Sequence, residues 1–153
     1  MDVLDEEVLR LWKILYKYEV RYILVGGFAT NLNGFSRFTA DLDLWLDDTA
    51  ANRKLFRKAL AEAEIGDFES LETIEMIPGW SSIYLNSGIE LDIMTSLKGF
   101  PKERFEDCYN LAPTILIHDV PVRFLHKNHL IEAKLALGRP KDLNDIEELR
   151  KLD

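Results

Sequence analysis

The sequence predicts an α/β (α+β) fold in which a mixed β-sheet is flanked by helices and followed by two C-terminal helices. Short apolar runs alternate with amphipathic stretches along the chain, an order typical of this class. Residues 86–88, Asn-Ser-Gly, separate two apolar runs and predict a hairpin turn. Because a hairpin contributes an antiparallel pair, we expect strands of both directions in the sheet.

The first half of the chain supplies helices and strands in alternation. Apolar residues at helical spacing follow acidic residues near the N-terminus, and Thr49 offers a helix cap later on. The short helix after the first strand is expected to end at Gly34. The predicted helices cover residues 4–18, 28–33 and 49–63, and the predicted strands cover 22–25 and 41–44.

The second half continues with short strands and ends in two helices. Pro140 fits the first turn of the last helix, since proline needs no hydrogen-bond acceptor there. The predicted strands cover residues 83–85, 89–94, 114–117 and 120–125, and the predicted helices cover 127–137 and 141–152.

Composition predicts one domain, residues 1–153, in a reducing cytoplasm. The chain is 47% hydrophobic and 30% charged, enough for one core. Its formal net charge of -8 argues against broad electrostatic binding of nucleic acid. The single cysteine excludes an intramolecular disulfide, and with three histidines it falls short of familiar structural zinc patterns. No signal peptide or long apolar span is recognisable, so no membrane association is expected.

Three aspartates form the main candidate site. Asp41 and Asp43 are two apart in a strand, so their side chains project from the same face, while Leu42 and Leu44 face a core. The apolar run 89–94 repeats the alternation, and Asp92 or Glu90 completes the cluster if the two strands pair. Clustered carboxylates suit a hard cation, Mg²⁺ above all, with Mn²⁺ as the alternative.

A glycine pair supplies the second part of the candidate site. Gly26 and Gly27 lie between the strand at 22–25 and the helix at 28–33. Glycine lets the backbone approach a phosphate, and the N-terminus of a helix favours negative charge. Alone, the pair is also explained by the sterics of a strand-to-helix turn. Together with the aspartates, it predicts a metal-dependent site for a nucleoside triphosphate.

At these motifs the chain resembles the nucleotidyltransferases of the DNA polymerase β superfamily, most closely the small bacterial branch related to AbiEii-type toxins and minimal nucleotidyltransferases. The matching segments cover most of the chain in order. They are residues 25–29, 37–44, 91–93, Lys134 and 139–145. The turn is Gly-Gly where many relatives have Gly-Ser, so a serine contact to phosphate is missing and backbone amides would replace it.

The resemblance implies roles for individual residues. Gly26 and Gly27 would hold the triphosphate, Asp41 and Asp43 would bind metal, and Asp92 would bind metal or activate the attacking hydroxyl. Further nucleotide-binding candidates come from the matching segments. They are Arg37, Thr39, Lys134, Lys141, Asp142 and Asp145.

Most of these further candidates also have a structural explanation. Lys134 either extends past the core to solvent or points at a ligand. Lys141 and Asp145 are four apart on a helix and could form a surface ion pair. Asp142 in the first helical turn interacts favourably with the helix dipole.

Two candidates in the acidic motif have structural alternatives as well. Arg37 contacts phosphate or braces the loop against an aspartate, and the sequence does not separate these two roles. A threonine such as Thr39 is more often a structural hydroxyl.

Two functions follow as hypotheses. The first is an enzyme that moves a nucleoside monophosphate from a triphosphate to a hydroxyl on tRNA, a protein or a small molecule. The second is a non-catalytic nucleotide-binding or interaction module, such as one component of a toxin–antitoxin pair. A protein partner fits the second because no separate acceptor-binding domain is expected. The presence of all three aspartates favours the first.

Overall fold

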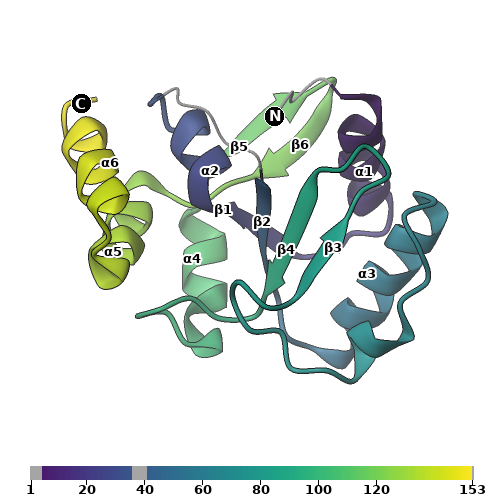
Figure 1. The fold of residues 1–153 in the computed structure, drawn as a ribbon. Helices are drawn as coiled ribbons and strands as arrows, with labels where there is room; N and C mark the ends of the chain where they lie inside the picture. The colour runs from purple at the N-terminus through teal and green to yellow at the C-terminus, as the bar shows by residue number, and fades with distance from the viewer. Residues whose placement is uncertain (1–4, 36–40, 153) are drawn as a thin grey trace.

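A four-stranded mixed sheet runs through the centre of the structure, a computed structural model that describes residues 5–35 and 41–152 (Figure 1). Its strands are β1 (Tyr22–Val25), β2 (Asp41–Leu46), β3 (Ser82–Tyr84) and β4 (Glu90–Met94), in the order β1-β2-β4-β3. The central pair, β2 and β4, is parallel, and both outer strands are antiparallel to their neighbours. The predicted mixed sheet is therefore confirmed.

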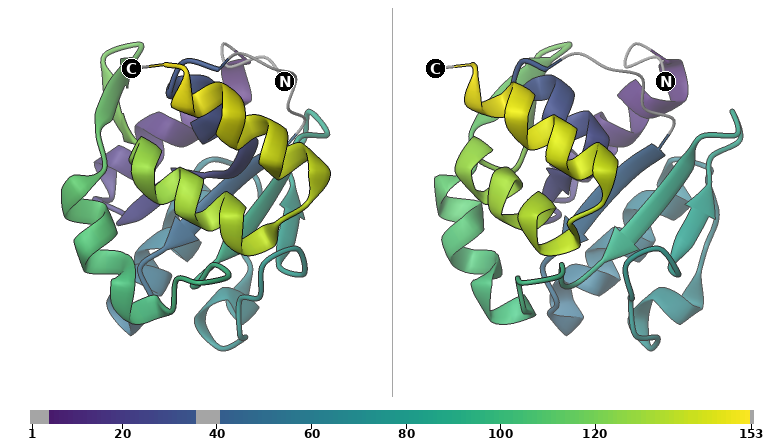
Figure 2. Two further views of the ribbon diagram at one scale, coloured as in Figure 1. Left: turned by 90° about the vertical axis from the view of Figure 1, so that its left-hand side faces the viewer. Right: turned by 60° about the vertical axis from the view of Figure 1, so that its left-hand side comes forward.

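Helices cover both faces of the sheet. Helices α1 (Glu6–Lys17) and α3 (Ala50–Glu62) pack against each other on one side. Helices α5 (Lys127–Leu137) and α6 (Pro140–Arg150) form an antiparallel pair on the other, where α5 also contacts α2 (Gly26–Leu32) (Figures 1 and 2). The remaining elements are α4 (Phe105–Leu111), the 3₁₀ turns η1 (Glu69–Glu72) and η2 (Lys102–Arg104), and the separate hairpin of β5 (Thr114–Ile117) and β6 (Val120–Arg123).

Strand β2 shows why the sheet has one apolar and one functional face. Leu42 and Leu44 are fully buried, as the alternating pattern predicts. The opposite face begins with Asp41 and Asp43 and continues with Trp45, whose ring packs edge-on against Phe105 with 5.4 Å between centroids. The acidic end of this face is therefore followed, along the same strand, by buried aromatic packing.

The structure revises several element boundaries. Helix α2 begins at Gly26, so both glycines belong to its first turn rather than preceding it. Strand β2 extends to Leu46, and the last helix begins at Pro140. Helix α4 was not expected because it is short, buries only two residues and has no side-chain cap.

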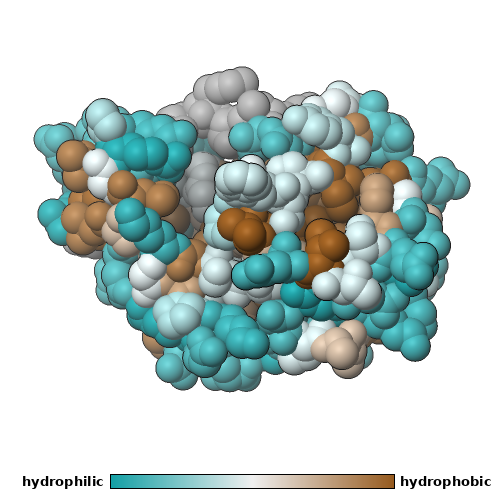
Figure 3. All heavy atoms as spheres, turned by 60° about the horizontal axis from the view of Figure 1, so that its bottom comes forward, coloured by the Kyte–Doolittle hydropathy of each residue, from teal (hydrophilic) through white to brown (hydrophobic). Residues whose placement is uncertain are grey.

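The face of the molecule drawn in Figure 3 is mainly hydrophilic, with hydrophobic residues exposed in separate patches, one of them on the α5–α6 side. Exposed leucines of these helices include Leu135, Leu137 and Leu143. Among the described residues, none of the helices combines the length and apolar character needed to cross a bilayer.

Candidate functional site

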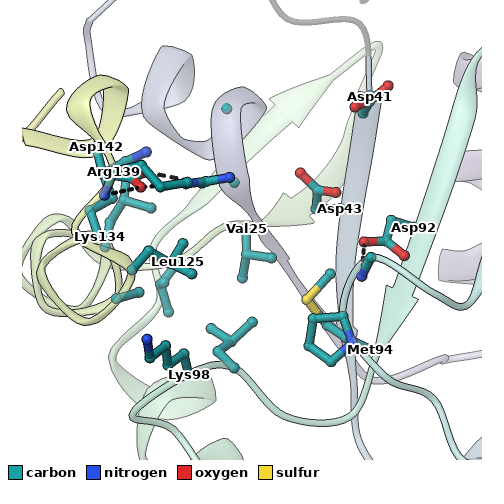
Figure 4. Close-up of a pocket in the computed structure, with 18 of the residues that line it drawn as sticks. Val25, Asp41, Asp43, Asp92, Met94, Lys98, Leu125, Lys134, Arg139 and Asp142 are labelled. Atoms are coloured by element: carbon teal, nitrogen blue, oxygen red, sulfur yellow. Dashed lines mark hydrogen bonds and ion pairs between the residues drawn. The ribbon is translucent and has the colours of Figure 1, made fainter. Parts of the chain in front are cut away.

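The parallel register between β2 and β4 brings the predicted carboxylates together. Asp43 is paired with Asp92, and Asp41 is paired with Glu90. Since paired residues of neighbouring strands point to the same face, the four acids form one acidic wall. Asp41, Asp43 and Asp92 line a pocket of about 500 Å³ between the sheet and helices α5 and α6 (Figure 4). This volume is in the range of small-molecule sites.

Asp43 is the most perturbed acid of the wall. Burial, together with the nearby charges of Asp92, Asp41 and Glu90, raises the pKa of its carboxyl to about 7, and Lys141 opposes the shift. A group with this pKa is only partly ionised at neutral pH. Nearby positive charge would therefore stabilise its ionised form.

Asp92 is held in place from the side of β3. Its Oδ2 accepts a hydrogen bond of 2.9 Å from the backbone N–H of Gly79, and its Oδ1 accepts one of 3.3 Å from the Ser82 hydroxyl. Burial raises the pKa of Asp92, these two hydrogen bonds oppose the rise, and Glu90 and Asp41 add to it. Each carboxylate oxygen has a second lone pair, so the group can still contact a ligand.

Gly26 packs directly against Asp43. Its φ of +72° lies in the left-handed region, and a Cβ atom added there would lie 2.1 Å from Asp43 Oδ2. Glycine therefore serves two purposes at this position, conformational and steric. The first turn of α2 consequently lies closer to strand β2 than it could with any residue other than glycine at position 26.

The first turn of α2 contributes backbone donors to the pocket. Gly26 and Gly27 both line it. Val25 precedes the helix and supplies no side-chain cap among the described contacts. Amides in a first helical turn have no acceptor within their own helix, so they are available to an anion. The Thr30 hydroxyl donates to the Gly26 carbonyl at 3.1 Å and fixes the turn.

Lys134 and Asp145 connect α5 to α6. The Lys134 ammonium donates to Asp145 Oδ2 at 2.8 Å, and the two side chains are only 6% and 2% exposed. Removing one partner of a buried ion pair typically costs about 3–5 kcal/mol because the other charge remains buried. Lys134 also lines the pocket, so this pair both joins the helices and places a positive charge at the site.

Arg139 and Asp142 form a second connection at the start of α6. Asp142 Oδ2 accepts from Arg139 Nε at 2.6 Å and from the Arg139 backbone N–H at 3.1 Å, which completes a capping box. The Arg139 side chain is half exposed and its guanidinium points across the pocket towards the acidic wall (Figure 4). The hydrogen bond to Asp142 raises the pKa of the Arg139 guanidinium, and the negative charge of Asp43 contributes to the rise.

The lower part of the pocket in Figure 4 is apolar. Met94 of β4 and Leu125 before α5 lie there, and Lys98 is the labelled cation on that side. The other apolar lining residues are Val25, Pro78, Leu97, Leu130, Ala133 and Leu137. The pocket therefore has an acidic wall, an apolar end, and a basic wall formed by Lys134, Arg139 and Lys141.

The predicted site residues fall into three groups. The pocket brings together the three aspartates, the two glycines, Lys134, Lys141 and Asp142. Asp145 does not line the pocket and bonds to Lys134, which does. Arg37 and Thr39 lie outside the described residues.

The surface ion pair considered for Lys141 and Asp145 is wrong. Asp145 is buried and bonds to Lys134 of the neighbouring helix, while Lys141 is exposed at the pocket. Helical spacing indicates neighbours within one helix only, so it could not reveal this contact. Asp142 does occupy the first helical turn, as expected, and additionally binds Arg139.

Two pocket cations were not among the predicted site residues. Arg139 lies within a matching motif segment, and the charged residue before Pro140 was the available signal. No signal in the sequence marked Lys98, because it follows β4 in a turn whose position beside α5 depends on tertiary packing.

The acidic wall has the chemistry of a partial metal site. Within residues 5–35 and 41–152, no three Asp, Glu, His or Cys side chains are close enough to form a complete ligand set. Mg²⁺ is usually held by one or two protein carboxylates together with substrate phosphates. Asp43 and Asp92, hard oxygen donors whose ionised forms are disfavoured, fit this arrangement.

The sequence and the fold both resemble those of known proteins. A sequence model of the family described as "Nucleotidyltransferase of unknown function (DUF6036)" matches residues 1–151. Among curated proteins, none matches the sequence significantly.

Two solved structures resemble the fold. A Thermotoga maritima protein provisionally named a nucleotidyltransferase has a TM-score of 0.61 and 18% identity, over 94% of this chain and 89% of that one. An antigenic nucleotidyltransferase-like protein from Paracoccidioides brasiliensis has a TM-score of 0.55 and 21% identity, over 95% and 72%. At these identities the likeness concerns the fold, and it supports the predicted fold class.

Replacing Gly26 by alanine tests its contact with Asp43. The variant Gly26→Ala should lose about 1–2 kcal/mol from the left-handed backbone conformation and more from displacing the Asp43 carboxylate. Gly88→Ala is the matched control, because Gly88 also has a positive φ, +93°, but a Cβ added there would meet nothing within 4 Å. Urea unfolding of both variants measures the difference. Equal losses would contradict the close packing of Gly26 on Asp43.

The raised pKa of Asp43 predicts a pH-dependent stability. Between the pKa of an unfolded aspartate, about 3.9, and the folded value of about 7, the folded state binds more protons. This group therefore reduces stability as pH rises through that window. In metal-free buffer, Asp43→Asn should raise the free energy of unfolding by on the order of 1–3 kcal/mol at pH 8 and by less at pH 4.5.

Urea unfolding at the two pH values measures this effect. Asp119→Asn, in the turn between β5 and β6, is the control and should change little at either pH. A gain for Asp43→Asn that is the same at both pH values would contradict the perturbed carboxyl.

Proposed function

Because the chain belongs to the family of nucleotidyltransferases of unknown function, we propose that its pocket transfers a nucleoside monophosphate from a nucleoside triphosphate to a hydroxyl group and releases pyrophosphate. The observation that carries this proposal is the division of charge across the pocket. Asp43 and Asp92 lie side by side on the sheet, and Lys134, Arg139 and Lys141 line the same pocket from α5 and α6.

The basic wall fits the triphosphate. Arg139 offers a planar fork of donors, and its bond to Asp142 leaves part of that fork available. Lys141 is exposed at the pocket and adds a mobile charge. On the opposite side, the amides of Gly26 and Gly27 in the first turn of α2 would donate to the phosphates, since among the described residues the N-cap, Val25, supplies no side-chain cap.

The acidic wall fits a divalent cation, Mg²⁺ or Mn²⁺, held by Asp43 with Asp41 and Asp92. When bound, the ion neutralises charge on the phosphates and polarises the phosphorus–oxygen bonds. Burial and mutual repulsion already disfavour the ionised carboxylates, so a bound cation would offset the free-energy cost of ionising them.

The chain's own contribution to the reaction is orientation and proton transfer. The acceptor hydroxyl attacks the α-phosphorus, a new oxygen–phosphorus bond forms, and the bond to the bridging oxygen of pyrophosphate breaks. Asp92 accepts the hydroxyl proton, which suits a carboxyl whose pKa is raised and whose position is fixed by Gly79 and Ser82. Positioning and electrostatics supply most of the rate enhancement.

The acceptor defines the finer function. A hydroxyl on tRNA, a protein or a small molecule is compatible with the pocket, and a protein partner could present it. The relation to the branch of AbiEii-type toxins stays a prediction. So does the alternative of a nucleotide-binding module without catalysis, which the following experiment distinguishes from the enzyme.

Removing the paired carboxylates should abolish transfer without unfolding the protein. We expect Asp43→Asn and Asp92→Asn each to reduce turnover at least about 100-fold, because each removes a charge that acts in the transition state. Pyrophosphate release with Mg²⁺, each of the four triphosphates and a host extract as acceptor source measures this. Asp119→Asn, remote from the pocket, should retain full activity.

Two results would argue against an enzymatic function. Unchanged pyrophosphate release in either site variant would contradict the assigned roles. Binding of a triphosphate without release under any condition would favour the non-catalytic alternative.

A further inference from the structure

We infer that Lys98 selects the nucleobase of the donor by facing position C6 of a purine or C4 of a pyrimidine. It then favours guanine and uracil, which carry a carbonyl oxygen at that position, over adenine and cytosine, which carry an amino group there. This inference rests on the proposed function, because it assigns the apolar end of the same pocket to the base of the bound triphosphate. Lys98 would be a specificity-determining residue, with no part in the transfer step.

A tight turn immediately after β4 fixes the backbone of Lys98. The N–H of Leu97 donates to the Phe100 carbonyl at 2.9 Å, and the N–H of Phe100 donates back to Leu97 at 2.8 Å. Gly99 within the turn has a φ of +83° and packs so closely on α5 that an added Cβ would lie 3.3 Å from Ala136. The turn is thus closed by its own hydrogen bonds and packed against α5, and Lys98 extends from it.

The surroundings of Lys98 suit a flat apolar ring. Met94 and Leu125 line the pocket on the side of Lys98, away from Asp41 (Figure 4), and Leu97 is a further apolar lining residue. A base placed against these side chains would be buried on apolar surface, as in most ligand sites. Its triphosphate would then extend towards the glycine turn and the basic wall.

Lys98 differs from the pocket cations whose bonds are formed within the protein. Lys134 is bonded to Asp145, and Arg139 to Asp142. In the part of the chain that the structure describes, the Lys98 ammonium makes no hydrogen bond or ion pair. Its three donors are therefore available to a ligand.

The chemistry of an ammonium group determines which bases it favours. It donates hydrogen bonds and cannot accept them. Guanine offers O6 and N7 as adjacent acceptors, and uracil offers O4. Adenine and cytosine place an amino group at the equivalent position, and that donor would face another donor. Lys98 is exposed, and the loss of one charge-assisted hydrogen bond at such a site corresponds to a preference of roughly tenfold.

The test measures dissociation constants of GTP, UTP, ATP and CTP with Mg²⁺ for the intact protein and for Lys98→Met. The wild type should bind GTP and UTP roughly tenfold more tightly than ATP and CTP. Lys98→Met should weaken only GTP and UTP, so that all four constants become similar. Lys102→Met is the control, because Lys102 is exposed in η2 and does not line the pocket.

Each other outcome has a defined meaning. A wild-type preference for ATP or CTP would overturn the inference. An equal loss of affinity for all four nucleotides in Lys98→Met would also overturn it, and would assign Lys98 to the phosphates. Both results leave the proposed function intact, whereas failure of the wild type to bind any triphosphate would contradict both. Retained ATP affinity in Lys98→Met shows that the variant is folded.

Discussion

The parallel pairing of β2 with β4 forces Asp43 and Asp92 to lie side by side, and the pocket is organised around the repulsion between these carboxylates. Burial makes their charged forms still less favourable and raises both pKa values. A chain selected only for stability would carry apolar or neutral residues there. The proposed function accounts for the cost of the acidic wall, because its metal ion would bring positive charge to these carboxylates.

Helices α5 and α6 bring the opposite charge to the same pocket. They do so through two internal contacts, the buried pair of Lys134 and Asp145 and the capping box of Arg139 and Asp142. A buried ion pair contributes little net stability compared with apolar packing, so its value here lies in orientation. The pair fixes α6 against α5, which holds Arg139 and Lys141 at the edge of the pocket.

Local patterns in the sequence were sufficient to predict the mixed sheet, most of the helices and the shared face of the central aspartates. Alternation in β2 placed Leu42 and Leu44 in the core and Asp41 and Asp43 on the other face. The pairing of Lys134 with Asp145 could not be predicted, because it joins two helices whose packing is a tertiary property. For the same reason Lys98 was missed, since only the packing of its turn on α5 brings it to the pocket.

The most direct test is the thermal unfolding midpoint with Mg²⁺ and each triphosphate, for the wild type and the Asp41→Asn, Asp43→Asn double variant. A ligand at 100 times its Kd stabilises the folded state by roughly 2.7 kcal/mol, which corresponds to a rise of about 5–11 °C for a domain of this size. We expect a rise with at least one triphosphate that requires Mg²⁺ and disappears in the variant. A midpoint that no triphosphate changes, or an equal rise in the variant, would contradict a metal–nucleotide site built on the acidic wall.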